Sequence, residues 1–493
     1  MIDRCGRNID YLRISVTDRC NLRCIYCMPE EGVQHVERSL ILQEEEILRI
    51  CRVMAELGIR KIKLTGGEPL VRPRMPKLVE KLKKMPGIEK VTLTTNGVLL
   101  KDQMRDFARA GLDGLNISLD TLDEVCSRQI TRRDELGRTL EGISEALKYP
   151  EISLKINCVP LGIPEQDLCR VAFLAKDHKV HVRFIEMMPI GMGKEFHGVS
   201  EEELLGILGE KLPRFSPYVG EPLGNGPCHY YDVDGFSGKI GFISAVSHKF
   251  CGECNRIRLT SQGFLKTCLQ YAAGRDLRGV IRSGGSDEEL KAVILEALAE
   301  KPDEHAFGGG LEKQKDDKTE KLCMAQIGGG VMKRVAVITS SDKGYRGERE
   351  DLSGPAAKEI VEAAGYVVVS MDVLPDDRGL LSARMAEIAD QGLAELILTT
   401  GGTGFSQRDV TPEATEDVIE RRVPGIPEAM RAFSLTITKR AMLSRATAGI
   451  RKGTLIVNLP GSPKAVRECL EVIIEALGHG IEILTGETGE CGR

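Results

Sequence analysis

The sequence contains no tryptophan, and aromatic residues make up only 4% of its 493 residues. This scarcity argues against an aromatic platform on which single-stranded nucleic acid could stack. The charges nearly balance, with 68 Lys and Arg against 73 Asp and Glu, so no basic field predicts nucleic-acid binding. No run of about 18 apolar residues predicts a membrane-spanning helix, and residues 1–7 contain no signal-peptide core. We therefore expect a soluble cytoplasmic protein that contacts neither nucleic acid nor membrane.

Cysteine, by contrast, is abundant, with fifteen residues. In a chain of this length without an export signal, they do not predict a disulfide framework. Nine are scattered singly and are interpreted as small buried hydrophobic residues or incidental thiols. The other six form two groups of three, which predict metal or iron–sulfur ligands: Cys20, Cys24 and Cys27, and Cys251, Cys254 and Cys268.

The first part of the chain alternates short β-branched stretches with amphipathic ones, which predicts parallel strands joined by helical crossovers. Six such units predict an α/β fold, an open or partial (β/α)6 barrel over residues 1–195. Strands are predicted at 11–16, 61–65, 90–95, 114–119, 153–160 and 181–188, and helices at 43–57, 75–85 and 102–110. Residues 196–329 are less regular and form a C-terminal extension that contains the second cysteine group.

A separate α/β domain is predicted over residues 332–493, of normal single-domain size. Residues 308–321, which precede it, are Gly-rich and then charged, and predict a solvated stretch. Within the domain, strands are predicted at 334–339, 366–371, 395–400 and 454–458, and helices at 355–364, 379–389 and 464–477.

The first cysteine group, Cys20-x3-Cys24-x2-Cys27, follows the first predicted strand. Three thiolates at this spacing can hold three irons of a 4Fe–4S cube and leave the fourth iron open to an exogenous ligand. The alternative is a zinc site that lacks its fourth ligand. The second predicted strand ends in Thr65-Gly66-Gly67-Glu68-Pro69, where the glycines allow close backbone approach and the carboxylate can bind an ammonium group. Alone, this motif could be a turn.

Together with Asn96 and Ser118 at later strand ends, these motifs resemble the radical S-adenosylmethionine (SAM) superfamily. The resemblance implies that SAM binds the open iron and is cleaved by electron transfer to methionine and a 5′-deoxyadenosyl radical. It implies that an electron donor is needed. The SAM-binding residues that it implies are Tyr26, Gly67, Glu68, Asn96, Ser118 and Met188.

The second cysteine group, Cys251-x2-Cys254-x13-Cys268, has the same three-thiol pattern, with a structural zinc knuckle as the alternative. With the motifs YLRISVTDRCNLRCIYCMP, KLTGGEPLVR, TTNGVLL, NISLDTL, RFIEMMPIG and CGECNRIRLTSQGFLKTCL, residues 1–329 resemble the MoaA family of GTP 3′,8-cyclases, which act in molybdenum-cofactor biosynthesis. The resemblance implies a second 4Fe–4S cluster whose open iron binds the guanine of GTP. It also implies a role for a terminal Gly-Gly pair, here Gly328-Gly329, which in this chain is internal.

By the same resemblance, GTP would be contacted by Arg13, Lys63, Thr94, Lys155, Arg256, Ile257 and Arg258. A triphosphate needs several Lys or Arg donors, although any one of them taken alone is better explained as a solvated charge. Lys63 stands where Arg is expected, which changes the geometry of that contact.

Two loops of the second domain carry the residue types that bind phosphate through backbone N–H groups. Residues 398–404 (LTTGGTG) run from a strand into a Gly-rich loop, a pattern that phosphate sites share with plain turns. Residues 458–464 (NLPGSPK) repeat this arrangement before a helix start. The ligand-contacting residues predicted in the two loops are Gly401, Gly402, Thr403, Gly404, Gly461 and Ser462.

These loops, with the segments 340–342 and 374–376 and the run RDVTPEAT, resemble the MogA/MoaB family, a three-layer α/β fold. The resemblance implies binding of molybdopterin and, in active members, its adenylylation with ATP. Asp376 and Asp409 are the implied catalytic carboxylates, suited to Mg²⁺ beside ATP phosphates. The alternative roles are a turn at Asp376 and a helix cap or Asx turn at Asp409.

The sequence thus predicts a bifunctional enzyme of one cofactor pathway, active as a homo-oligomer. Its substrates would be GTP, SAM, molybdopterin and ATP, and its cofactors two 4Fe–4S clusters, SAM and Mg²⁺. In one alternative, the second domain is a non-catalytic pterin-binding or oligomerising module. In another, the thiols form zinc or redox-sensor sites.

Overall fold

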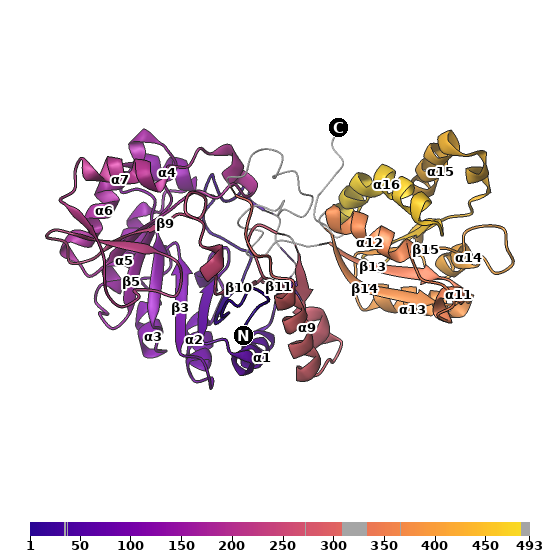
Figure 1. Ribbon diagram of the computed structural model, residues 1–493, viewed down its shortest axis with the longest axis horizontal. Coiled ribbons are helices and arrows are strands. Elements are labelled where there is room, and N and C mark those ends of the chain that lie inside the picture. Colours follow the sequence, from indigo (N-terminus) through magenta and orange to yellow (C-terminus); the bar gives the residue numbers. More distant parts are fainter. Residues whose placement is uncertain (34–35, 37, 272, 308–332, 365, 485–493) are drawn as a thin grey trace. The chain divides into compact units, whose positions relative to one another are not determined.

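The computed structural model describes residues 1–33, 36, 38–271, 273–307, 333–364 and 366–484. The chain divides into two compact units, Met1–Val331 and Met332–Arg493 (Figure 1). Gly328 and Gly329 lie outside the described residues. None of the helices in the described ranges has the length and apolar character needed to cross a membrane.

All six strands predicted in the first unit are present and pair in parallel in chain order. Crossover helices lie between them in the sequence, so the predicted α/β alternation is confirmed. The strands are β1 (Tyr11–Ser15), β2 (Lys61–Thr65), β3 (Lys90–Thr95), β4 (Gly114–Ser118), β5 (Ser153–Cys158) and β6 (His181–Ile185). The helices are α1 (Glu44–Leu57), α2 (Met75–Lys83), α3 (Met104–Arg109), α4 (Glu124–Thr131), α5 (Leu136–Ala146) and α6 (Leu168–Asp177).

Helix α1 illustrates why these segments fold as they do. Its buried residues include Ile47, Ile50 and Met54, whose spacing of three and four places them on one face of a helix. A capping box closes its N-terminus, where the Glu46 side chain accepts from the Gln43 backbone N–H at 2.7 Å. Gly58 ends it in a left-handed conformation, with φ of 114°.

The less regular region after β6 extends the same sheet at both edges. Strand β9 (Ile240–Ile243) pairs in parallel with β6, and β10 (Arg256–Leu259) pairs in parallel with β1. The second cysteine group therefore lies at the β1 edge of the sheet, far in sequence from the strand beside it. The other strands and α-helices described in this unit are β7 (Phe215–Pro217), β8 (His229–Val233), β11 (Phe264–Lys266), β12 (Gly274–Asp276), α7 (Glu201–Gly209), α8 (Leu277–Arg282) and α9 (Asp287–Ala299).

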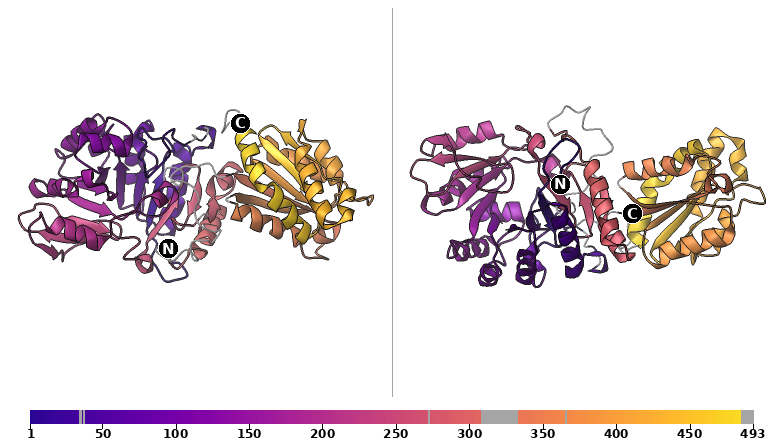
Figure 2. Two further views of the ribbon diagram at one scale, coloured as in Figure 1. Left: turned by 90° about the horizontal axis from the view of Figure 1, so that it is seen from above. Right: turned by 60° about the horizontal axis from the view of Figure 1, so that its bottom comes forward.

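The second unit has the predicted three layers, with helices on both faces of one sheet (Figures 1 and 2). Its strand order is β14-β13-β15-β18-β17-β16. The strands are β13 (Arg334–Ser340), β14 (Val367–Leu374), β15 (Leu396–Thr400), β16 (Arg421–Arg422), β17 (Ala448–Arg451) and β18 (Thr454–Leu459). One face packs on α12 (Ser353–Ala363), α15 (Gly425–Ile437) and α16 (Pro463–Leu484), and the other on α13 (Arg378–Asp390) and α14 (Thr411–Glu416).

Candidate active sites

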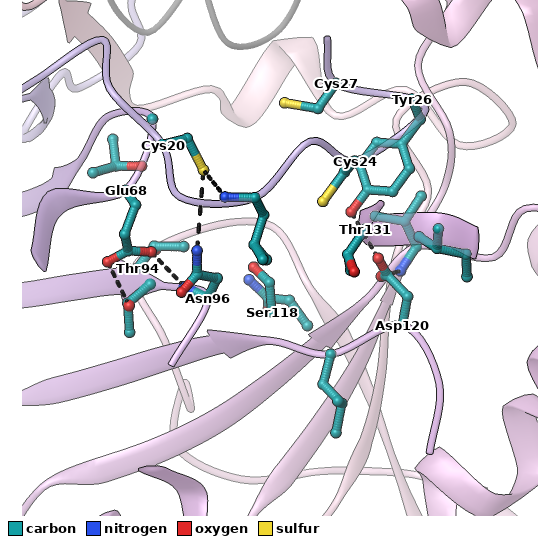
Figure 3. Close-up of a pocket in the computed structure, with 18 of the residues that line it drawn as sticks. Cys20, Cys24, Tyr26, Cys27, Glu68, Thr94, Asn96, Ser118, Asp120 and Thr131 are labelled. Carbon is teal, nitrogen blue, oxygen red and sulfur yellow. Dashed lines mark hydrogen bonds between the residues drawn. The ribbon is translucent and has the colours of Figure 1, made fainter. Parts of the chain in front are cut away.

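A cavity of about 290 Å³ lies at the carboxyl ends of the parallel strands of the first unit, where α/β sheets place ligands (Figure 3). Its lining joins residues predicted for SAM with residues predicted for GTP. The predicted residues in the lining are Arg13, Cys20, Cys24, Tyr26, Cys27, Gly67, Glu68, Thr94, Asn96, Ser118 and Arg258. One cavity therefore combines much of both predicted sites.

The first cysteine group forms a tight loop on the cavity wall. The Cys27 N–H donates to the Cys24 carbonyl at 2.9 Å, and the three sulfur atoms face a common space (Figure 3). Burial raises the pKa of the Cys20 thiol to about 11 and that of Cys24 well above its usual value. A metal would have to displace these protons on binding. Three thiols around one space beside an open cavity fit a cluster that leaves one iron for a further ligand.

Gly66 and Gly67 bring the second strand end against the cysteine loop. A Cβ on Gly66 would lie 2.5 Å from the Thr17 carbonyl oxygen, and one on Gly67 would lie 2.3 Å from that of Arg19. The Gly67 N–H donates to Thr17 at 2.9 Å and the Glu68 N–H to Arg19 at 2.7 Å. The two glycines therefore allow their own backbone to approach the backbone of Thr17 and Arg19, just before the first cysteine group.

Glu68 is 1% exposed and is held by three donors from its own chain. Its carboxylate accepts from the Thr95 hydroxyl at 2.6 Å, the Asn96 N–H at 2.7 Å and the Leu70 N–H at 2.9 Å. Burial raises the pKa of Glu68 to about 7, although these hydrogen bonds favour the charged form. Glu68 thus joins the ends of β2 and β3 while its side chain lines the cavity.

Tyr26 is oriented by Asp120, a residue that sequence reasoning missed. The Tyr26 hydroxyl donates to Asp120 at 2.7 Å, and the other Asp120 oxygen accepts from the Val159 N–H at 2.8 Å. Burial raises the pKa of Asp120 to about 6. Its place two residues after Ser118 at the end of β4, in the quoted motif NISLDTL, was the available signal.

Basic side chains from neighbouring strands share one face of the sheet. Arg13 on β1 is in register with Arg258 on β10 and with Lys63 on β2. Residues in register on paired strands point to the same side. The Nε atoms of Arg13 and Arg256 are buried and have no hydrogen-bond partner among the described residues. Buried donors without partners on a cationic surface fit an anionic ligand such as a triphosphate.

Arg183 on β6 belongs to the same cationic surface and was not among the predicted residues. It is buried and donates to the Asn157 amide oxygen from Nε at 3.0 Å and from Nη2 at 2.5 Å. Burial, followed by the charge of Arg183, lowers the pKa of Lys155 to about 8. Arg183 lies in the quoted motif RFIEMMPIG, but a single arginine in a strand carries no distinguishing signal.

Five of the predicted contact residues are not part of the 290 Å³ cavity lining: Lys63, Lys155, Met188, Arg256 and Ile257. Ile257 is 1% exposed and belongs to the hydrophobic core, because alternation along β10 turns it away from its arginine neighbours. Met188 packs against Ile190 and Phe307 and is not part of the 290 Å³ cavity lining.

The second cysteine group lies in a different electrostatic environment from the first. Burial acts to raise the pKa of the Cys254 thiol, but Lys301 and Arg256 outweigh it and lower the pKa to about 7. The His305 N–H donates to the Cys251 sulfur at 3.4 Å. Over the residues that the structure describes, no three His, Cys, Asp or Glu side chains converge as ligands of a single metal ion. This does not conflict with a 4Fe–4S cluster, because each thiolate in such a cluster binds a different iron.

A cavity of about 190 Å³ lies at the carboxyl ends of the strands of the second unit. Of the predicted loop residues, Gly401 and Gly461 line it, together with Ser340, Ser341 and Arg349. The two loops touch, since a Cβ on Gly461 would lie 3.2 Å from the Gly401 Cα. The other predicted loop residues, Gly402, Thr403, Gly404 and Ser462, are not part of this lining.

Those four residues have contacts within the chain. A Cβ on Gly402, whose φ is 64°, would lie 2.3 Å from the Thr411 hydroxyl, and one on Gly404 would lie 2.9 Å from the Asp409 carboxylate. Ser462 accepts from the Ala465 N–H at 3.2 Å at the start of α16. The Arg445 N–H donates to the Thr403 carbonyl at 3.0 Å.

Asp376 contacts Asp342 directly, whereas Asp409 is linked to Asp342 through its neighbour Arg408. Asp376 accepts from the Ser340 hydroxyl at 2.6 Å and from the Asp342 N–H at 3.2 Å. Asp342 also forms an ion pair with Arg408, the residue before Asp409. Asp409 accepts from the Ser406 N–H at 2.8 Å, which is a turn contact. Asp342 and Arg445, whose Nε donates to the Gly404 carbonyl at 2.6 Å, were not among the predicted residues.

The fold and the cysteine-lined cavity define the first unit as a radical SAM protein. The family model described as "Radical SAM superfamily" matches residues 14–175, and "Molybdenum Cofactor Synthesis C" matches residues 180–307. These matches imply SAM and iron–sulfur cofactors. The model described as "Probable molybdopterin binding domain" matches residues 336–479 of the second unit.

Curated relatives of the first unit are named GTP 3′,8-cyclase. The protein of Clostridium perfringens strain 13 is 44% identical over 331 residues, which is 67% of this chain and all of that protein. The protein of Petrotoga mobilis is 45% identical over 337 residues, with the same coverage. The chain therefore belongs to the GTP 3′,8-cyclase family.

Among solved structures, the molybdopterin biosynthesis enzyme MoaB of Thermus thermophilus is 45% identical. The match covers 31% of this chain and 98% of that chain, with a TM-score of 0.30.

Proposed function

We propose that the chain is a bifunctional enzyme of molybdenum-cofactor biosynthesis. The first unit converts GTP to (8S)-3′,8-cyclo-7,8-dihydroguanosine 5′-triphosphate, and the second transfers AMP from ATP to molybdopterin with Mg²⁺. The observation that carries the cyclase is the single cavity that joins the first cysteine group to Arg13 and Arg258. An electron donor, a homo-oligomeric state and a cytoplasmic location belong to the same proposal.

In the first unit, separate sets of residues would bind the two ligands, SAM and GTP. Cys20, Cys24 and Cys27 would hold one 4Fe–4S cluster, and Cys251, Cys254 and Cys268 a second. SAM, when bound, supplies the 5′-deoxyadenosyl radical. The buried cations on β1, β2, β5, β6 and β10 would fix the triphosphate through charge-assisted hydrogen bonds, which restrict the ribose to one orientation.

The low pKa of Lys155 predicts a pH dependence of GTP use. Below pH 8 its ammonium group is charged and attracts the triphosphate, and above pH 8 it is neutral. Because kcat/KM reports groups of the free enzyme, kcat/KM for GTP should fall above pH 8, by at most about tenfold per pH unit, and level off at the activity of the enzyme with a neutral residue 155. The measurement is kcat/KM for GTP between pH 6.5 and 9.5.

Lys155→Met should raise KM at pH 7 and remove this decline. Lys101→Met is the matched control, because Lys101 pairs with Glu141 on the surface. The interpretation fails if the decline above pH 8 persists unchanged in Lys155→Met.

In the second unit, adenylyl transfer is supported by the two loops and two carboxylates at one end of the sheet. The Gly401 and Gly461 loops would bind the pterin phosphate and its surroundings. Asp376 contacts Asp342, and Asp409 follows Arg408, the ion-pair partner of Asp342. The two carboxylates Asp376 and Asp409 would hold Mg²⁺ where the pterin phosphate meets the ATP α-phosphorus.

Two assays test the whole proposal. Iron and sulfide are measured in anaerobically purified protein, where two 4Fe–4S clusters per chain support it and two zinc ions refute it. The protein is then given GTP, SAM and a reductant, and separately molybdopterin and Mg-ATP. If molybdopterin binds but no pyrophosphate is released above background, the second unit is a binding module.

A further inference from the structure

The segment 301–305 lies along the second cysteine group and contacts it through both backbone and side chains. The His305 N–H donates to the Cys251 sulfur at 3.4 Å. Arg7 donates to the Pro302 carbonyl at 2.8 Å and to the Asp303 carbonyl at 2.9 Å, and the same guanidinium donates to the Cys251 carbonyl at 3.0 Å. The segment and the first cysteine of the group are therefore held by one side chain.

Lys301 is the buried charge of this segment, with 2% of its surface exposed. Its ammonium group donates to the Thr267 carbonyl at 2.6 Å, the Arg256 carbonyl at 3.1 Å and the Cys254 sulfur at 3.6 Å. Thr267 directly precedes Cys268. All three donors of the ammonium group are thus directed at the backbone or sulfur of the second cysteine group and its neighbours.

A buried ammonium group is costly unless negative charge lies beside it. No carboxylate pairs with Lys301 in the part of the chain that the structure describes. The negative charge available is that of the cysteine thiolates, which a metal cluster requires in deprotonated form. Hydrogen bonds to the sulfurs and nearby charge are what set the reduction potential of such a cluster.

We propose that Lys301 is the buried counter-ion of the second iron–sulfur cluster, and that it raises the reduction potential of that cluster. This rests on the proposed second cluster. In the first cysteine group, by comparison, the Cys20 sulfur accepts from the Leu22 N–H at 3.5 Å and from the Asn96 side-chain amide at 4.0 Å. Lys301 is a positioning residue and does not itself touch GTP.

The test isolates the second cluster in the full-length chain. A parent variant with Cys20, Cys24 and Cys27 changed to Ala is reconstituted anaerobically, and its midpoint potential is measured by redox titration followed by electron paramagnetic resonance. Adding Lys301→Met should lower the equilibrium constant for reduction about tenfold or more, which is 59 mV for a one-electron couple. Adding Lys291→Met should change nothing, because Lys291 pairs with Glu56 and Glu288 on the surface.

An unchanged potential in Lys301→Met with full iron content would overturn the proposal. If Lys301→Met binds no iron, Lys301→Arg decides. If Lys301→Arg restores a cluster with a potential near that of the parent, the positive charge at residue 301 is what the cluster needs, and the proposal is supported. If Lys301→Arg restores no cluster, the proposal is overturned. If the parent itself binds no iron, the second cluster of the proposed function fails together with the counter-ion. That result is distinct from a failure confined to the Lys301 variants.

Discussion

Replacing Cys24 by Ser is expected to reduce SAM cleavage to background, whereas replacing Cys268 by Ser should leave SAM cleavage and abolish GTP cyclisation. Cys24 lines the same cavity as Tyr26 and Asn96, so its loss should remove a ligand of the cluster proposed to deliver the electron. Cys268 belongs to the group beside the cationic strand β10 and would act on the position of GTP. The measurements are 5′-deoxyadenosine and cyclised product in the same anaerobic reaction.

The iron content of each variant shows whether the intended cluster was removed. Iron should fall by about half in both, and Cys5→Ser, which changes an exposed thiol outside both groups, should retain it. Equal loss of SAM cleavage in the Cys24 and Cys268 variants would contradict the division of roles between the two groups.

Asp376→Asn or Asp409→Asn is expected to lower adenylyl transfer by roughly 100-fold or more, the scale of losing one electrostatic stabiliser of a transition state. Asn retains the shape of the side chain and an acceptor for the Ser340 hydroxyl or the Ser406 N–H. It lacks the charge that would hold Mg²⁺. Affinity for molybdopterin should change far less, because the loops proposed to bind the pterin, which contain Gly401 and Gly461, would not need the metal to do so.

The measurement is Mg²⁺-dependent pyrophosphate release from ATP by the full-length chain, with molybdopterin binding titrated in parallel. Asp390→Asn is the matched control, since Asp390 pairs with Arg451 and Lys452 at the surface. If the two active-site variants release pyrophosphate at the rate of the Asp390 variant, the metal-binding role of these carboxylates is wrong.

The glycine and carboxylate of the TGGEP motif show how one motif can have a second role that sequence does not reveal. Gly67 and Glu68 were predicted from what they could offer a ligand. In the structure, both also make contacts within the chain, Gly67 with the Thr17 carbonyl and Glu68 with the ends of two strands. Gly67 and Glu68 therefore hold the backbone that precedes the first cysteine group and also line the cavity. A substitution at either position would disturb the packing of that backbone as well as the cavity.

The local parts of this protein follow from the sequence alone. Alternating β-branched and amphipathic stretches predicted the six parallel strands, and each cysteine group is recognisable because its three cysteines lie within a short stretch of chain. The same periodicity predicted a second α/β domain, whereas its three layers were predicted from the resemblance to the MogA/MoaB family. Short-range spacing carries this information because a strand, a helix or a metal-binding loop is formed by residues close together in the chain.

Only the tertiary structure brought the site together. Pairing of β10 with β1 places Arg258 beside Arg13, although most of the first unit separates them in sequence. The same pairing turns Ile257 into the core. Pairing of β6 with β5 adds Arg183 to the cationic surface, and the segment after α9 brings Lys301 to Cys254. Such contacts depend on which strands become neighbours and in which register, and register decides on which face of the sheet each side chain lies. No pattern local to any one of these residues contains that information.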